Sequence, residues 1–188
     1  MESPFEVLSQ VASAFEENGI PYLVVGSFAS SMRGLYRATA DIDIAADLRP
    51  EHVRPLVDAL QDKFYIDEQA VRRALSRHGS FNAIHFDAVF KVDIFVPPAD
   101  DFSRQQLARR RAEKMAPDMA QEIYAATAED SILARLLRYR KGGEVSRVRW
   151  ADVLGIIGTQ GAALDVEYLN VWADPLGVRD LLEKVLSS

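Results

Sequence analysis

The sequence of 188 residues contains no cysteine. This absence excludes disulfide frameworks, thiolate nucleophiles and cysteine-ligated zinc, and it agrees with a reducing compartment. No apolar run approaches the roughly 18 residues that a membrane-spanning helix needs, and the chain does not start with a basic segment followed by an apolar one. We therefore expect a cytoplasmic protein without a membrane partner.

Several catalytic signatures are also missing. The three histidines lack the spacing of a zinc site, and there is no GxSxG, Walker or GxGxxG motif. A formal net charge of −6 argues against a general nucleic-acid binder, although residues 101–150 carry 11 basic and 7 acidic side chains. That stretch is either a surface for phosphate or RNA, or a solvated face.

The hydrophobic patterns predict the fold class. The chain is 48% hydrophobic, which is enough for one core, or for a catalytic core with a smaller satellite. Short apolar runs typical of strands alternate with helical periodicity up to about residue 125, and only helical patterns follow. We expect an α/β (α+β) fold with a mixed sheet flanked by helices over residues 1–125, and a small helical region over residues 126–188.

Local signals place the expected elements. Strands are expected at 22–25, 40–45, 81–86 and 90–98. The last two are expected to pair antiparallel, and a second hairpin is expected around Pro117. Helix-start residues precede other segments, namely Ser3 before Pro4, Thr127, and Ser146. Further helices are expected over 28–33, 50–60 and 69–77, and around 169–172 and 181–185.

Two aspartates stand two residues apart in the expected strand at 40–45. Because successive strand residues point to opposite faces, Asp41 and Asp43 share one face and repel each other. Asp93 interrupts another apolar strand, in the stretch KVDIF. Converging carboxylates are tolerated where a hard divalent cation such as Mg²⁺ neutralises them. The alternative is that Asp43 caps a helix and Asp93 pairs with an arginine.

A small-residue turn precedes the paired aspartates. The strand at 22–25 ends in Gly26-Ser27, and 13 residues separate this pair from the sequence DID. A strand that ends in small residues and leads into a helix offers free N–H groups and a positive helix dipole, which favour phosphates. A phosphate site and a metal site are therefore expected within one strand–helix–strand unit.

The arrangement GS, 13 residues, DID and a later aspartate resembles the DNA polymerase beta-like nucleotidyltransferase superfamily. The resemblance implies a nucleotidyltransferase-type mixed sheet and transfer of a nucleoside monophosphate from an NTP to an acceptor hydroxyl. It implies that Gly26 and Ser27 contact the triphosphate. It also implies that Asp41, Asp43 and Asp93 are catalytic and ligate Mg²⁺ or Mn²⁺, Asp93 helping to activate the acceptor hydroxyl.

A narrower likeness extends along the chain. The stretches RATADIDIA, TAEDSILARLLRYRKGGEVSRVRWADV and LNVWADPLGV resemble small bacterial nucleotidyltransferases related to the AbiEii/AbiGii toxins. In such relatives a helix lysine and a later arginine-aspartate motif complete the nucleotide site. Here Arg135 replaces that lysine, which puts an acid–base role at this position in doubt, and Asp152 matches the downstream aspartate.

The acceptor is not determined by these motifs. The resemblance leaves open RNA such as a tRNA 3′ end, or a protein in a toxin–antitoxin setting with an antitoxin partner. A small molecule such as an antibiotic is the other acceptor, and a non-catalytic nucleotide sensor is the alternative function. Arg37 either binds the γ-phosphate or is a surface loop arginine.

Other cations have two interpretations each. Lys91 shares the face of Asp93 and is expected to pair with that carboxylate rather than to act as a catalytic group. Five cations surround the Gly142-Gly143 break and face either an acceptor or solvent: Arg138, Arg140, Lys141, Arg147 and Arg149.

Overall fold

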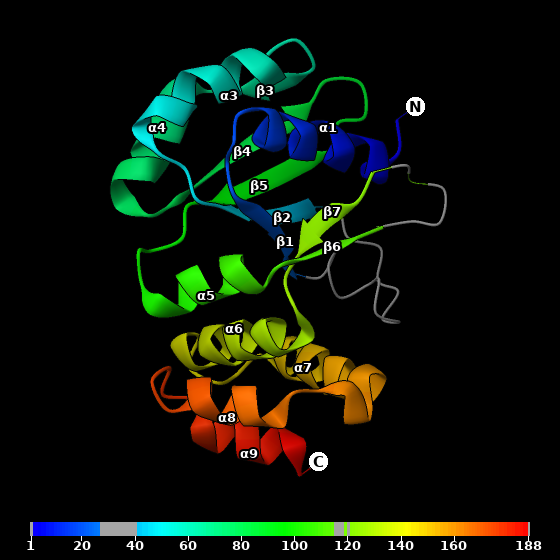
Figure 1. The fold of residues 1–188 in the computed structure, drawn as a ribbon, viewed down its shortest axis with the longest axis vertical. Coiled ribbons are helices and arrows are strands. Elements are labelled where there is room, and N and C mark those ends of the chain that lie inside the picture. The colour runs from blue at the N-terminus through cyan, green and yellow to red at the C-terminus, as the bar shows by residue number, and fades with distance from the viewer. Residues whose placement is uncertain (1, 27–40, 115–118, 120, 188) are drawn as a thin grey trace.

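A computed structural model describes residues 2–26, 41–114, 119 and 121–187. Its strands are β1 (Tyr22–Val25), β2 (Asp41–Ala46), β3 (Phe64–Ile66), β4 (Ser80–His85), β5 (Lys91–Phe95), β6 (Arg111–Glu113) and β7 (Ile123–Ala125). They form one mixed sheet in the order β3-β4-β5-β2-β1-β7-β6 (Figure 1). The central pair β2–β5 is parallel, and β1–β2 and β4–β5 are antiparallel.

The helices lie on both sides of this sheet. They are α1 (Pro4–Glu17), η1 (Pro50–His52), α3 (Val53–Leu60), α4 (Glu68–Arg77), α5 (Asp101–Arg109), α6 (Ala128–Lys141), α7 (Arg147–Gln160), η2 (Gly161–Ala163), α8 (Val166–Ala173) and α9 (Arg179–Leu186). Figure 1 shows α1, α3 and α4 on one side, and α5 with the bundle α6–α9 on the other. No described helix has the length and apolar character needed to cross a membrane.

The alternation in the central strands determines which face is buried. In β2, Ile42 and Ile44 are fully buried in the core beneath α1 and α3, and in β5, Val92 and Ile94 are equally buried. The intervening residues therefore point to the opposite face, toward α6. This face carries the candidate site.

Two hydrophobic clusters hold the protein together. The first joins α1, α3 and α4 to the sheet, with members between Val7 and Ala125. The second joins α5 to the helices α6–α9, with members between Phe102 and Val185. Trp150 and Trp172 pack against the second cluster.

A buried polar network joins α5, α6 and α8. Asp130 is fully buried and accepts hydrogen bonds from the hydroxyls of Thr127 at 2.9 Å and Tyr168 at 2.6 Å. The Arg109 guanidinium lies 3.7 Å from the centre of the Tyr168 ring and 3.7 Å from Asp130 Oδ2. Burial raises the pKa of Asp130, while these hydrogen bonds lower it.

The predicted elements that lie within the described residues are present. Ser3 caps α1 with a full capping box, and Thr127 and Ser146 cap α6 and α7. The second hairpin is present as β6 paired antiparallel with β7. The sequence patterns missed β3 and α5, and the helix expected over 28–33 lies outside the described residues.

We predict that Tyr168→Phe destabilises the protein by about 1–3 kcal/mol, because a buried Asp130 oxygen loses its donor. Urea unfolding followed by circular dichroism measures the change. Tyr65→Phe is the matched control, since Tyr65 is 59% exposed. A loss no larger than that of the control would show that the Tyr168 hydroxyl does not support Asp130.

Candidate active site

Acidic side chains meet where β2 and β5 run in parallel. The register places Asp43 directly opposite Asp93, and Asp41 directly opposite Lys91. Because these residues alternate with the buried isoleucines and valines, they all lie on the face toward α6. The structure therefore brings together the three carboxylates that the sequence singles out.

Lys91 lies among these carboxylates. Its ammonium Nζ is 2.7 Å from Asp93 Oδ2 and 3.7 Å from Asp41 Oδ2. The hydrogen bond to Asp93 is the main reason that the pKa of Lys91 is raised, although burial opposes it. The expected pairing of Lys91 with Asp93 is present.

The surroundings of Asp43 disfavour its ionised form. Burial raises the pKa of its carboxyl, and the charges of Asp93 and Asp41 raise it further. Arg138 and Lys91 act in the opposite direction, without cancelling the rise. Asp43 is therefore a carboxylate whose ionised form needs additional positive charge nearby.

Gly26 directly follows β1 and lies beside Asp43. Its φ is +75°, and a Cβ atom at this position would overlap with Asp43 Oδ2. Only glycine permits that approach without displacing the carboxylate. The sequence suggests a phosphate-binding role for Gly26, and the structure adds a steric one. Ser27 and Arg37 lie outside the described residues.

Arg135 connects the C-terminal helices α6 and α7 to Gly26. From α6 it donates one hydrogen bond to Asp152 on α7 at 3.1 Å and another to the Gly26 carbonyl at 2.8 Å. Its side chain is only 13% exposed. Burial lowers the pKa of Arg135 and the Asp152 carboxylate raises it. The planar guanidinium thus fixes the position of Gly26 relative to α6 and α7.

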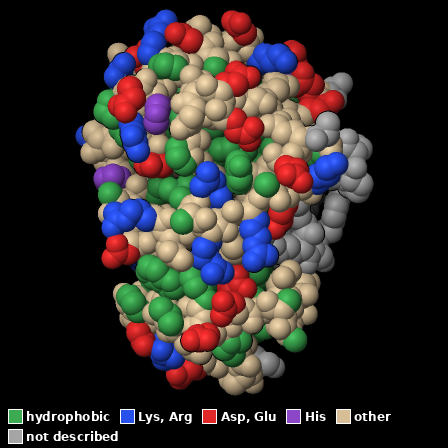
Figure 2. All heavy atoms as spheres, viewed as in Figure 1, with side chains coloured by type: hydrophobic (Ala, Val, Ile, Leu, Met, Phe, Trp, Pro, Cys, Tyr) green, Lys and Arg blue, Asp and Glu red, His purple; other side chains and the backbone are tan. Residues whose placement is uncertain are grey.

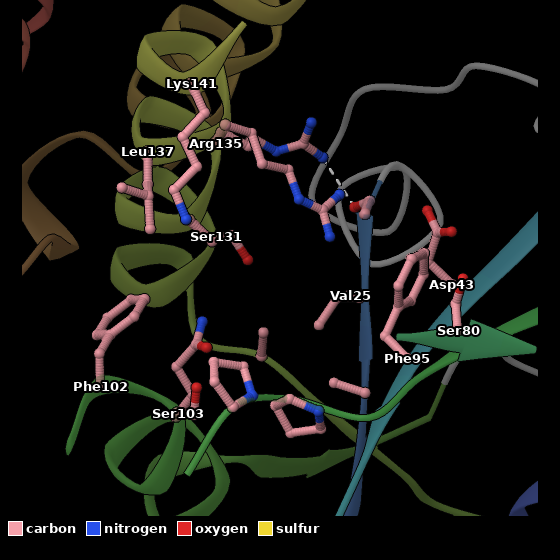
Figure 3. Close-up of a pocket in the computed structure, with 18 of the residues that line it drawn as sticks. Val25, Asp43, Ser80, Phe95, Phe102, Ser103, Ser131, Arg135, Leu137 and Lys141 are labelled. Atoms are coloured by element: carbon pink, nitrogen blue, oxygen red, sulfur yellow. Dashed lines mark hydrogen bonds between the residues drawn. The ribbon is translucent and has the colours of Figure 1, made fainter. Parts of the chain in front are cut away.

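We call the side of β2 and β5 that carries Asp41, Asp43 and Asp93 the acidic face. A cavity of about 860 Å³ separates the acidic face from the helical bundle. Figure 3 shows Arg135, Leu137 and Lys141 on its α6 side, opposite Asp43 and Phe95 on the sheet. Both members of the Arg135–Asp152 pair, Gly26, Asp41 and Asp43 line it, whereas Asp93 is not among the lining residues.

Three cations line the bundle side of the cavity without an ion pair to any described residue: Arg138, Lys141 and Arg149. The Arg138 guanidinium lies 5.6 Å from the centre of the Phe95 ring. Arg140, in contrast, points away and pairs with Glu144 and Asp180. Figure 2 shows Lys and Arg side chains gathered across the middle of the molecule, at the level of α5 and α6 in Figure 1.

The part of the cavity that lies beside α5 was not predicted from the sequence. Pro97, Phe102 and Gln106 line the cavity. Asp100 is the N-cap of α5, and its carboxylate accepts a hydrogen bond from Ser103 N at 2.7 Å. An aspartate before a polar segment is a helix-start signal that identifies this element.

The carboxylates have the donor chemistry of a divalent-cation site. Asp oxygens are the hard ligands that Mg²⁺ and Mn²⁺ prefer, and Gly26 leaves space for one of them. Among the described residues, however, no group of three or more Asp, Glu, His or Cys side chains is arranged to hold a metal ion. A metal role for Asp41, Asp43 and Asp93 therefore stays a prediction.

Comparison with known proteins finds similarity in structure only. No protein-family model and no curated protein matches the sequence. The solution structure of the antibiotic-resistance factor ANT(2'')-Ia matches with a TM-score of 0.56 and 16% identity, over 91% of each chain. An antigenic nucleotidyltransferase-like protein from Paracoccidioides brasiliensis gives a TM-score of 0.57 and 13% identity, over 97% of this chain and 91% of its own. The chain has the nucleotidyltransferase fold.

A crystal structure of ANT(2'')-Ia in complex with adenylyl-2''-tobramycin matches as well. Its TM-score is 0.55 at 15% identity, and the match covers 93% of this chain and 97% of that one. The nucleotidyltransferase-type mixed sheet expected from the sequence is thereby confirmed. The narrower resemblance to the AbiEii/AbiGii toxins, and the division at residue 125, stay predictions.

We predict that Asp43→Asn stabilises the protein at pH 8 in the presence of a chelator. A carboxyl whose pKa is raised on folding contributes stability below its unfolded pKa, and that contribution is lost as the pH rises through the folded pKa. The melting-temperature gain of the variant should therefore shrink toward zero as the pH falls to about 4. Thermal melts across this range measure it, with exposed Asp87→Asn as the control. A gain that persists unchanged at low pH would contradict this account of Asp43.

Proposed function

We propose that the protein is a metal-dependent nucleotidyltransferase that moves a nucleoside monophosphate from an NTP to an acceptor hydroxyl. The observation that carries the proposal is the pairing of Asp43 opposite Asp93 on a cavity-facing strand pair, beside Gly26. The nucleotidyltransferase fold around this acidic face supports it. The bond that forms joins the acceptor oxygen to the α-phosphorus, and the bond that breaks releases pyrophosphate.

The acidic face supplies the cation site in this proposal. Asp41, Asp43 and Asp93 would hold Mg²⁺ or Mn²⁺, which when bound stabilises the negative charge on the reacting phosphate oxygens. Asp93 accepts the proton of the acceptor hydroxyl. Gly26 and Ser27 bind the triphosphate, and Arg37 its γ-phosphate. Arg135 holds the nucleotide site together through its hydrogen bond to the Gly26 carbonyl, and Asp152 orients the Arg135 guanidinium.

The opposite side of the cavity supports phosphate binding. A cavity of about 860 Å³ is within the size range of small-molecule sites. Arg138, Lys141 and Arg149 add positive charge along the bundle. Arginine and lysine at such a position favour phosphate oxygens.

The same cations favour an acceptor that itself carries phosphate, and RNA is the acceptor that we propose first. A polycationic acceptor would be repelled by Arg138, Lys141 and Arg149. The second candidate is a small-molecule acceptor, and the match to ANT(2'')-Ia bound to adenylyl-2''-tobramycin favours it. Protein acceptors and an antitoxin partner stay proposals of lower rank, because no described feature selects them.

We predict that purified protein with Mg²⁺ transfers label from an α-labelled NTP to total RNA, and that Asp43→Asn and Asp93→Asn each reduce the rate at least about a hundredfold. A bound divalent cation is worth several kcal/mol of transition-state stabilisation, and each 1.36 kcal/mol is tenfold in rate. Parallel reactions with protein extract and with an aminoglycoside test the other acceptors. The matched control, Asp87→Asn, lies in the exposed turn between β4 and β5 and should retain the full rate.

The outcomes separate the candidates. Label in RNA that disappears in both aspartate variants supports the proposed reaction. Label only in the aminoglycoside supports the second candidate. Tight nucleotide binding without transfer to any acceptor, in wild type and variants alike, would contradict the proposed enzymatic activity and favour a nucleotide sensor.

A further inference from the structure

Lys91 uses the same oxygens that the proposed metal site needs. Its ammonium is 2.7 Å from Asp93 Oδ2 and 3.7 Å from Asp41 Oδ2, and two of the three proposed ligands are therefore in contact with one internal cation. This contact follows from the fold, because Lys91 stands opposite Asp41 in the register and two residues before Asp93. The pairing is therefore built into the two central strands.

The ammonium is free to move without a change in the backbone. The Lys91 side chain is 38% exposed, and lysine carries its charge on a flexible four-carbon stem. Asp93 is 24% exposed and lies on a central strand, so its carboxylate stays while the ammonium leaves. An exchange of partners at Asp93 needs only rotamer changes of Lys91.

We propose that Lys91 competes with the divalent cation for Asp93 and Asp41, and that it thereby makes metal binding depend on nucleotide. This inference rests on the proposed function. An ion that ligates Asp93 Oδ2 takes that oxygen from the ammonium, so free metal binds weakly. When the metal binds together with a triphosphate, the displaced ammonium gains phosphate oxygens as new partners. These new contacts offset the loss of its contacts with Asp93 and Asp41.

A simpler role for Lys91 is that of a structural ion pair that supports the carboxylates. The two roles predict opposite effects of removing the ammonium. A supporting lysine holds the carboxylates in place, so its loss weakens metal binding. A competing lysine occupies them, so its loss strengthens metal binding.

The experiment measures the dissociation constant for Mn²⁺ by electron paramagnetic resonance, with and without a non-hydrolysable NTP analogue. We expect Lys91→Gln to bind free Mn²⁺ about fivefold more tightly than wild type, the equivalent of one partly exposed ion pair. The analogue should tighten Mn²⁺ binding more in wild type than in Lys91→Gln. Lys91→Arg, which keeps the charge, should not bind free Mn²⁺ more tightly than wild type.

The matched control removes a different cation, Lys141, which lines the cavity. Lys141→Gln changes the net charge equally, but Lys141 has no ion pair with a described carboxylate. The change in the logarithm of the Mn²⁺ dissociation constant that Lys141→Gln causes should be less than half of the change that Lys91→Gln causes. Circular dichroism and melting temperature verify that each variant is folded.

Two results would overturn the inference. One is an unchanged or weaker affinity for Mn²⁺ in Lys91→Gln. The other is an equal gain in Mn²⁺ affinity in Lys141→Gln, which would indicate only the general electrostatic effect of removing a positive charge. Either result leaves the proposed function intact if label transfer still depends on Asp43. A wild-type protein that binds no Mn²⁺ even with the nucleotide analogue would instead contradict the metal-dependent function itself.

Discussion

The candidate site depends on the parallel register between β2 and β5. That register sets Asp43 opposite Asp93, an unfavourable pair of charges, and it is fixed by the apolar residues on the other face. Each fully buried isoleucine or valine contributes about 1.5–3 kcal/mol. A slip by one residue would expose these side chains and bury the carboxylates. The core on one face thus enforces the acidic cluster on the other.

The rest of the site compensates for that repulsion. Lys91 lies between two of the carboxylates, and Arg138, from the opposite side of the cavity, opposes the rise that burial causes in the pKa of Asp43. Gly26 leaves room for the Asp43 oxygen, and Arg135 secures the Gly26 carbonyl from α6. Positive charge therefore reaches the acidic face from both the sheet and the bundle. This arrangement suits a site that binds cations and phosphates together.

Local sequence patterns predicted the elements better than their contacts. The alternation in β2 and the caps of α1, α6 and α7 are short-range signals, and the structure confirms those elements. The pairing of Lys91 with Asp93 was also predictable, because two residues that stand two positions apart on one strand share a face.

The parallel pairing of Asp43 with Asp93 joins strands about 50 positions apart in sequence, and the contact of Arg135 with Gly26 spans 109 positions. Such contacts depend on topology, which no local pattern specifies. Helix α5 was missed because only Phe102 and Ser103 of it are buried, and its periodicity is weak.

The most direct test of the account is a crystal structure with Mn²⁺ and a non-hydrolysable NTP analogue, in which anomalous scattering locates the metal. The account predicts an anomalous peak ligated by oxygens of Asp43 and Asp93, with the triphosphate beside Gly26 and the Lys91 ammonium turned away from Asp93. Mn²⁺ bound elsewhere in the cavity, with the Lys91–Asp93 ion pair intact and the Asp43 carboxylate free of metal, would contradict it.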